Sequence, residues 1–109
     1  MRRSDDFTSV VRAGVRSRRG CLVVHLSPSL RDPAEDAPAQ VGLIVGKTVG
    51  GSVVRHRVAR RLRGQLASRV SGLPSGSGVV VRAMPDAADA TSARLGADLD
   101  AALERLLTR

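Results

Sequence analysis

The sequence predicts a single α/β (α+β) sandwich, in which a small mixed sheet packs against helices. Segments rich in β-branched residues alternate with amphipathic segments of helical period, in the order α-β-β-β-α-β-α. At 109 residues, the chain is long enough to bury roughly two-thirds of its unfolded surface as one domain. Phe7 is the only aromatic residue, so the predicted core is aliphatic.

The first half of the chain is predicted to contain a helix and up to three strands. Ser4 can cap a helix that ends at Gly14, and a short additional strand is a candidate around residues 15–19. A second strand over 21–27 has two faces, with Leu22, Val24 and Leu26 on one and Cys21, Val23 and His25 on the other.

Residues 28–40 contain three prolines and are predicted to form a mobile surface loop. VGLIVGK (41–47) is predicted to be a buried strand, followed by a tight turn, TVGG, at 48–51. A long helix is expected from Ser52 to about Val70.

A strand over 79–84 is predicted to end at Pro85. Because this strand and the one over 41–47 flank a long helix, they are predicted to lie parallel. Thr91 or Ser92 caps a last helix, whose predicted apolar stripe is Leu95, Leu99, Leu103, Leu106 and Leu107.

The composition limits the kinds of site that the chain can hold. One cysteine permits no internal disulfide, and neither a zinc-type cluster nor a C-x-x-C motif is present. Cys21 is expected to pack as a small apolar residue. The N-terminus lacks an apolar signal segment and no apolar run approaches the length of a membrane span, so we expect a cytoplasmic protein without membrane partners.

The net charge of +8 is confined to one stretch of the chain. Residues 37–85 contain eight Lys and Arg and no Asp or Glu, whereas the rest of the chain holds ten bases and ten acids. Such a basic stretch is typical of nucleic-acid binders. All but one of the 18 bases are Arg, whose fork binds phosphate oxygens bidentately.

The segment SVVRHRVARRLR (52–63) concentrates this charge on a predicted helix. Val54, Val58 and Leu62 recur every four residues and share one face. The arginines at 57, 60, 61 and 63 fan over most of the other side, and Arg55 lies in the first turn. Each of the four is therefore expected to contact nucleic acid with little effect on folding.

The segment GKTVGGSVVRHRVARRLR (46–63) closely resembles the signature of the bacterial ribonuclease P protein subunit family, and the resemblance extends over most of the chain. The positions that agree are Lys47, Gly50, Val53, Val54, Arg55, Arg57, Arg60 and Arg63. Four positions depart from the family pattern: Thr48, Gly51, His56 and Ala59.

The resemblance implies a small basic protein bound to a catalytic RNA that removes the 5′ leader from precursor tRNA. The chemistry then belongs to the RNA and to Mg²⁺ ions held mainly by the RNA subunit, with no protein active site and no obligate protein partner. The family also implies a left-handed β-α-β crossover, against the general right-handed preference.

Two surfaces are implied by the resemblance. The implied contacts with the catalytic RNA are Lys47, Arg55, His56, Arg57, Arg60, Arg61 and Arg63. The implied cleft for the leader of precursor tRNA contains Phe7, Val11, Arg16, Arg18, Arg19 and His25. With one aromatic ring, leader binding is expected to be electrostatic more than aromatic. Phe7 has the alternative of a core position, and His25 that of a plain strand residue.

Three other functions remain open at this point. A ribosomal-type RNA-binding module explains the charge but not the order of residues in the signature. A protein nuclease acting alone needs a catalytic site, and His25 and His56 have no Cys, Ser or carboxylate partner at a recognisable motif spacing. A membrane-surface amphipathic helix fits the basic face, but Val and Ala make a weak insertion surface.

Overall fold

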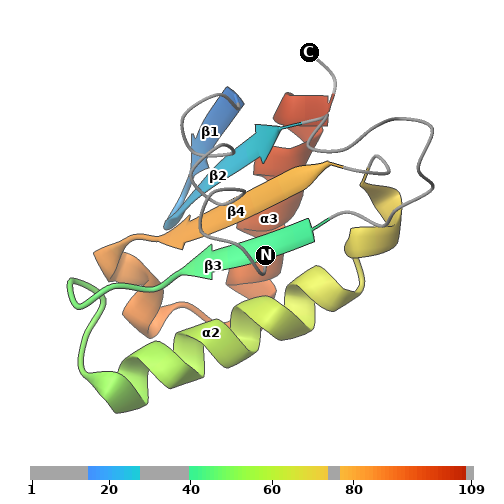
Figure 1. Cartoon of the computed structure of the whole chain (residues 1–109). Coiled ribbons are helices and arrows are strands. Elements are labelled where there is room, and N and C mark those ends of the chain that lie inside the picture. The colour runs from blue at the N-terminus through green and yellow to red at the C-terminus, as the bar shows by residue number, and fades with distance from the viewer. Residues whose placement is uncertain (1–14, 28–39, 74–76, 108–109) are drawn as a thin grey trace.

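The computed structural model describes residues 15–27, 40–73 and 77–107 (Figure 1). Its centre is a four-stranded mixed sheet with the spatial order β1-β2-β4-β3. The antiparallel pairs are β1–β2 and β2–β4, and β3 pairs with β4 in parallel, as predicted. The strands are β1 (Val15–Arg19), β2 (Leu22–Ser27), β3 (Gln40–Ile44) and β4 (Gly78–Ala83).

Two long helices complete the sandwich, α2 (Ser52–Ala67) and α3 (Ser92–Leu107). α3 packs against β1 and β2 and also against α2, which runs along the β3 side of the sheet (Figure 1). Two short 3₁₀ helices follow α2 and β4 respectively: η1 (Val70–Gly72) and η2 (Pro85–Asp89). The expected left-handed crossover between β3 and β4 stays a prediction.

The core lies between the two helices and one face of the sheet. Alternate residues of β2 and β4 point into it, and Leu22, Val24 and Val81 are fully buried. Val58, Leu62 and Leu66 of α2 are buried against them, which extends the predicted stripe by one turn. The predicted aliphatic core is therefore confirmed for the described residues.

The predicted stripe of α3 is confirmed except at its last position. Leu95, Leu99, Leu103 and Leu106 are buried, whereas Leu107 is 42% exposed. Leu107 ends the helix and lies about 100° further round it than Leu106, away from the sheet. Thr91 is the cap of this helix, because its Oγ1 accepts a hydrogen bond from the backbone N–H of Arg94 at 3.1 Å.

Helix α2 ends about three residues earlier than predicted, because the side chain of Arg69 replaces a backbone hydrogen bond. In a continued α-helix the N–H of Arg69 would bind the carbonyl of Gln65. Instead, Nη1 of the Arg69 guanidinium donates a hydrogen bond to the carbonyl of Gln65 at 2.7 Å. The backbone N–H of Arg69 donates to the carbonyl of Leu66 at 2.9 Å. Arg69 is held in this position by Asp100 of α3, whose carboxylate lies 2.6 Å from its Nε.

Strand β3 is shorter and more exposed than predicted. It ends at Ile44 instead of residue 47, and of its five residues only Gly42 is buried. The reason is its place at an edge of the sheet, where a strand is covered less than at the centre. The chain then turns tightly, with Gly50 N–H bound to Lys47 O at 3.2 Å. Gly50 has φ +154°, a region that side chains rarely tolerate.

The turn between β1 and β2 is anchored to α3. Gly20 has φ +55°, and a Cβ atom at this position would collide with the carboxylate of Asp98. The same carboxylate accepts hydrogen bonds from the backbone N–H of Cys21 at 3.2 Å and from its Sγ at 3.3 Å. Burial and then the hydrogen bond to Asp98 raise the pKa of the Cys21 thiol to about 11. Cys21 is thus a protonated anchor as well as the predicted packing residue.

Several predictions lie outside the described residues: the N-terminal helix with Phe7 and Val11, and the loop over 28–39. Residue 40, assigned to that loop from the sequence, is instead the first residue of β3. Within the described ranges, neither long helix has the length and apolar character needed to cross a membrane.

Candidate nucleic-acid interface

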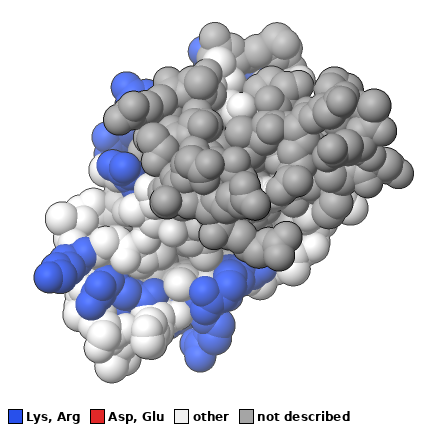
Figure 2. All heavy atoms as spheres, viewed as in Figure 1, with Lys and Arg blue, Asp and Glu red and all other residues white. Residues whose placement is uncertain are grey.

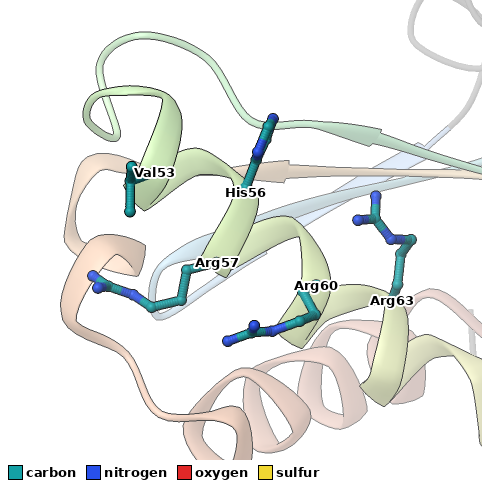
Figure 3. A pocket seen from close by; sticks show the side chains of 5 residues that line it. All are labelled: Val53, His56, Arg57, Arg60 and Arg63. Atoms are coloured by element: carbon teal, nitrogen blue, oxygen red, sulfur yellow. The ribbon is translucent and has the colours of Figure 1, made fainter.

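The first basic surface follows the solvent side of α2 and the turn before it. We call it the helix surface and define it by Lys47, Val53, His56, Arg57, Arg60 and Arg63. The last five line a shallow groove of about 590 Å³ (Figure 3). Arg57 and Arg60 extend along one side of the helix, and His56 and Arg63 extend to the other (Figure 3). No acid lies in the first turn of α2, so the positive end of the helix dipole adds to this charge.

Exposure separates the predicted RNA contacts into two groups. Lys47, His56, Arg60 and Arg63 are exposed, as a binding surface requires. The other three predicted contacts are partly buried: Arg55, Arg57 and Arg61. The Nε atoms of Arg55 and Arg57 are buried without a hydrogen-bond partner.

Two arginines of α2 also hold the protein together. Arg57 Nη2 donates a hydrogen bond to the carbonyl of Ala88 at 3.0 Å, and Arg61 Nη1 donates one to the carbonyl of Ala90 at 2.7 Å. Both carbonyls lie in or just after η2, which these bonds tie to α2. These bonds argue against the expectation that Arg57 and Arg61 have little effect on folding, and we assign both a structural role.

The second basic surface lies on the face of the sheet turned away from α2 and α3. Across β1 and β2, Arg16 is opposite His25 and Arg18 is opposite Val23. Directly opposite residues share a face, and this face alternates with the core-facing residues of β2. We call it the sheet surface.

Arg82 belongs to the sheet surface, although the sequence analysis did not assign it there. It is exposed, and it lies opposite Val23 across β2 and β4. Its neighbours Val81 and Ala83 are buried in the core, so strand alternation turns Arg82 outward. That alternation was the signal available in the sequence, but the pairing of β4 with β2 was needed to place Arg82 and Arg18 on opposite sides of Val23.

Arg19 was predicted to line the leader cleft, but it lies on the other face of the sheet. It is opposite Leu22, which is completely buried in the core. With Ala101, Glu104 and Arg105 it lines a pocket on the α3 side. A one-residue step along a strand reverses the face, so Arg19 and Arg18 cannot both belong to the sheet surface.

His25 is buried, with 5% of its surface exposed, and its Nδ1 has no hydrogen-bond partner. Burial, followed by the positive charges of Arg82 and Arg16, lowers the pKa of the imidazole below its usual value. The ring is therefore neutral near pH 7. It is a strand residue of β2 and not one of the cations of the sheet surface.

Within the described residues, the acids that form ion pairs lie on α3, outside both basic surfaces. Asp100 pairs with Arg69, which holds the pKa of this carboxyl below its ordinary value, and Asp98 pairs with Arg94 at 3.5 Å. On the side seen in Figure 2, the coloured residues include Lys and Arg but no Asp or Glu. Arg69 is thus neutralised within the protein, whereas the helix surface and the sheet surface keep their positive charge.

The side chains of the described ranges do not offer a group of three or more His, Cys, Asp or Glu able to hold a metal ion. Both basic surfaces instead present guanidinium groups, which repel cations and attract phosphates.

Comparisons with known proteins agree with this description. The family model for Ribonuclease P matches residues 1–107. The ribonuclease P protein component of Streptomyces bikiniensis is 53% identical over 111 residues, which cover 98% of this chain and 90% of that protein. That of Beutenbergia cavernae is 50% identical over 106 residues, covering 97% of this chain and 86% of the relative.

Solved structures show the same fold. The RNase P protein of Staphylococcus aureus superimposes with a TM-score of 0.80 at 21% identity, covering 96% of this chain and 92% of the other. The RNase P protein of Thermotoga maritima gives a TM-score of 0.76 at 18% identity, covering 100% and 96%. Taken with the family match over nearly the whole length, these findings show that the chain belongs to the ribonuclease P protein family.

Proposed function

We propose that this chain binds the catalytic RNA of ribonuclease P through the helix surface and the single-stranded 5′ leader of precursor tRNA through the sheet surface. It thereby assists removal of the leader to give the mature 5′ end of the tRNA. The observation that carries this proposal is the presence of two basic surfaces on different elements. One follows a helix and its turn, and the other crosses three strands.

The helix surface suits a folded RNA. Its exposed bases on α2 are distributed over about two turns, and a groove runs between them. Arg binds phosphate oxygens bidentately and stacks on bases, both of which a structured RNA offers. The sheet surface suits a single strand, because its charges follow one face of a sheet and phosphate contacts there require no particular sequence.

The second part of the proposal is that the protein supplies no catalytic group. Hydrolysis needs a positioned metal ion, nucleophile or general base. His25 is buried beside two arginines without a carboxylate partner, and His56 lies among the arginines of the helix surface. In our proposal Mg²⁺ is held by the RNA subunit, because the residues of the two surfaces do not suit a divalent cation.

The role of the protein is then electrostatic. By neutralising phosphates of the RNA subunit and of the leader, it reduces the Mg²⁺ concentration that the complex needs to fold and to bind precursor tRNA.

Processing of precursor tRNA by the cognate RNA subunit, with and without this chain, tests the proposal. At low Mg²⁺ we expect rapid cleavage only with the protein present, and at raised Mg²⁺ cleavage by the RNA alone. RNA-free protein should not cleave. Cleavage by RNA-free protein that is lost in His25→Ala or His56→Ala would overturn the non-catalytic role.

A further inference from the structure

We propose that a groove between α2 and β3 receives one unpaired base of the catalytic RNA, from a nucleotide whose phosphate is bound by Arg63. We call it the edge groove, because β3 is an edge strand of the sheet. This inference rests on the proposed binding of the RNA subunit at the helix surface. It adds to that surface an apolar site, which binds a base and not a phosphate.

The edge groove is lined mainly by apolar side chains that the protein itself covers incompletely. Its volume is about 550 Å³, within the roughly 300–1,000 Å³ usual for ligand sites. Leu66 is buried, Ala67 is exposed, and the other apolar side chains are half-buried. A flat ring can therefore cover apolar surface here. The side chains that line the groove are those of Arg63, Val41, Leu43, Leu66, Ala67 and Val70.

The two edges of the sheet differ in their protection. β1, at one edge, carries Arg16, Arg18 and Arg19 among its five residues, and charges on an edge strand keep other strands away. β3, at the other edge, has the sequence QVGLI, without a charged side chain. An apolar edge that stays accessible in this way is a typical contact site for another molecule.

The backbone of β3 adds polar groups to the rim of the edge groove. The N–H of Gln40 donates a hydrogen bond to the carbonyl of Ser77, just before β4, at 2.9 Å. Successive residues of a strand direct their backbone groups to opposite sides, so those of Leu43 face away from β4, at the open edge. An RNA base carries donors and acceptors on its edges, which an N–H and a carbonyl can pair with.

Arg63 connects the edge groove with the groove of the helix surface, because its side chain lines both. It extends from α2 on the side of β3, away from Arg57 and Arg60 (Figure 3). An RNA strand bound at the helix surface therefore passes the mouth of the edge groove. Arg63 can bind the phosphate of a nucleotide there while the base of that nucleotide turns inward.

The charge around the edge groove favours RNA over a second copy of this chain. Residues 37–85, which supply the whole lining, contain no Asp or Glu, and the chain has a net charge of +8. A symmetric contact between two copies would bring the same edge and the same Arg63 together, and surfaces of like charge repel each other. A polyanion that carries flat rings matches both the charge and the apolar lining.

The experiment compares two Ala→Met substitutions at exposed positions of helices. Ala67→Met places a longer side chain in the edge groove, and Ala97→Met makes the same change on α3, outside both basic surfaces. Affinity for the cognate RNA subunit is measured over a range of salt concentrations. Unpaired bases of that RNA are probed with dimethyl sulfate, which modifies adenine and cytosine, and with a carbodiimide, which modifies guanine and uracil. Thermal unfolding, and sedimentation without RNA, are measured in parallel.

We expect the unmodified protein to protect at least one unpaired base that Ala67→Met alone makes reactive again. Ala67→Met should also weaken RNA binding about five- to tenfold, which corresponds to the loss of one base contact. The salt dependence should keep its slope, because the phosphate contacts of the arginines remain. Ala97→Met should bind and protect the RNA as the unmodified protein does. Both variants should unfold normally, because both positions are exposed and Met is a good helix former.

Three results would overturn the inference while leaving the proposed function intact. The first is an Ala67→Met protein with full RNA affinity and an unchanged pattern of protection. The second is a loss of affinity with a shallower salt slope, which would mean that the groove holds a phosphate. The third is a dimer of the unmodified protein that Ala67→Met dissociates, which would make the groove a contact between copies. If the unmodified protein did not bind the RNA subunit at all, the proposed function would fail, and this inference with it.

Discussion

The helix surface and the sheet surface carry the same kind of charge but are built in different ways. On α2 the arginines come from one short run of sequence, and the same helix supplies both packing residues and exposed bases. On the sheet the arginines come from β1 and β4, with His25 of β2 between them, and the core-facing residues lie on the opposite face. The number of arginines on α2 therefore overstates the charge that is free to bind RNA, since Arg57 and Arg61 also donate hydrogen bonds within the protein.

Proximity in sequence and availability for binding are separate properties of these arginines. Arg60 and Arg61 are adjacent, yet one is exposed and the other binds the carbonyl of Ala90. Arg18 and Arg82 are far apart in the chain, yet both lie opposite Val23 on the same face. Substitutions can test both halves of the comparison.

The largest effect is expected from placing a charge in the packed side of α2. Val58 is completely buried, so Val58→Asp should lower the free energy of unfolding by about 4 kcal/mol or more. Val53, on the same helix, is 77% exposed and lines the groove. Val53→Asp should change stability by less than about 0.5 kcal/mol but weaken binding of the RNA subunit. Urea unfolding measures the change in stability, and RNA titration measures the change in affinity. If Val58→Asp and Val53→Asp lost the same stability, the assignment of Val58 to the packed side and Val53 to the exposed side would be contradicted.

A smaller effect should separate the arginines of α2 from one another. Arg60→Ala and Arg63→Ala should reduce RNA-subunit affinity, with a salt slope shallower by about 0.9 each, and should leave folding unchanged. Arg61→Ala should lower the free energy of unfolding by about 1 kcal/mol through loss of the bond to Ala90. Arg61→Ala with full stability and the same loss of RNA affinity as Arg60→Ala would show that the bond to η2 contributes nothing.

The sheet surface can be tested by two adjacent residues on opposite faces. Arg18→Ala should weaken binding of precursor tRNA by the holoenzyme about three- to tenfold at low salt, because one phosphate contact is lost. Arg19→Ala removes the same group one residue along the strand and should leave precursor binding unchanged. Raising the salt concentration should erase the difference. Equal losses in both variants would show that the face of the sheet does not matter.

The smallest effect concerns the pH dependence of folding. The lowered pKa of His25 means that the unfolded chain takes up a proton more readily than the folded one. Stability is therefore fully present above the unfolded pKa of about 6.5 and falls as the pH drops through that value towards the lower folded pKa. His25→Phe should remove this contribution. Unfolding free energies compared between about pH 5.5 and 7.5 measure it, and an unchanged pH dependence in the variant would contradict the buried neutral ring.

Much of the fold was predictable because it follows local periodicity. The stripe of Val58 and Leu62 follows the period of a helix, and the alternation of Leu22 and Val24 follows that of a strand. The parallel pairing of β3 with β4 followed from the long helix between them. The end of α2 was not predictable, because it depends on Asp100 of another helix holding the Arg69 side chain.

The part of the candidate site that comes from one continuous sequence segment was predictable. The part that depends on tertiary contacts was not. The exposed Arg60 and Arg63 followed from the helical pattern. The bond of Arg61 to the carbonyl of Ala90 requires η2 to lie beside α2, which no local pattern specifies. The facing of Arg19 was available in principle, since it follows once the turn after β1 is known to contain two residues, so that Arg19 lies opposite Leu22.

The parallel pairing of β3 with β4 also has a consequence for the order of folding. The β1–β2 hairpin closes over two residues, and hairpins form in about 1–10 μs. The β3–β4 pair encloses residues 45–77, so its closure carries a larger entropy cost and comes later. The whole of α2 belongs to that connection, and its apolar stripe has no complete sheet to cover until β3 is in place. The helix surface is thus expected to be among the last parts of the molecule to become ordered.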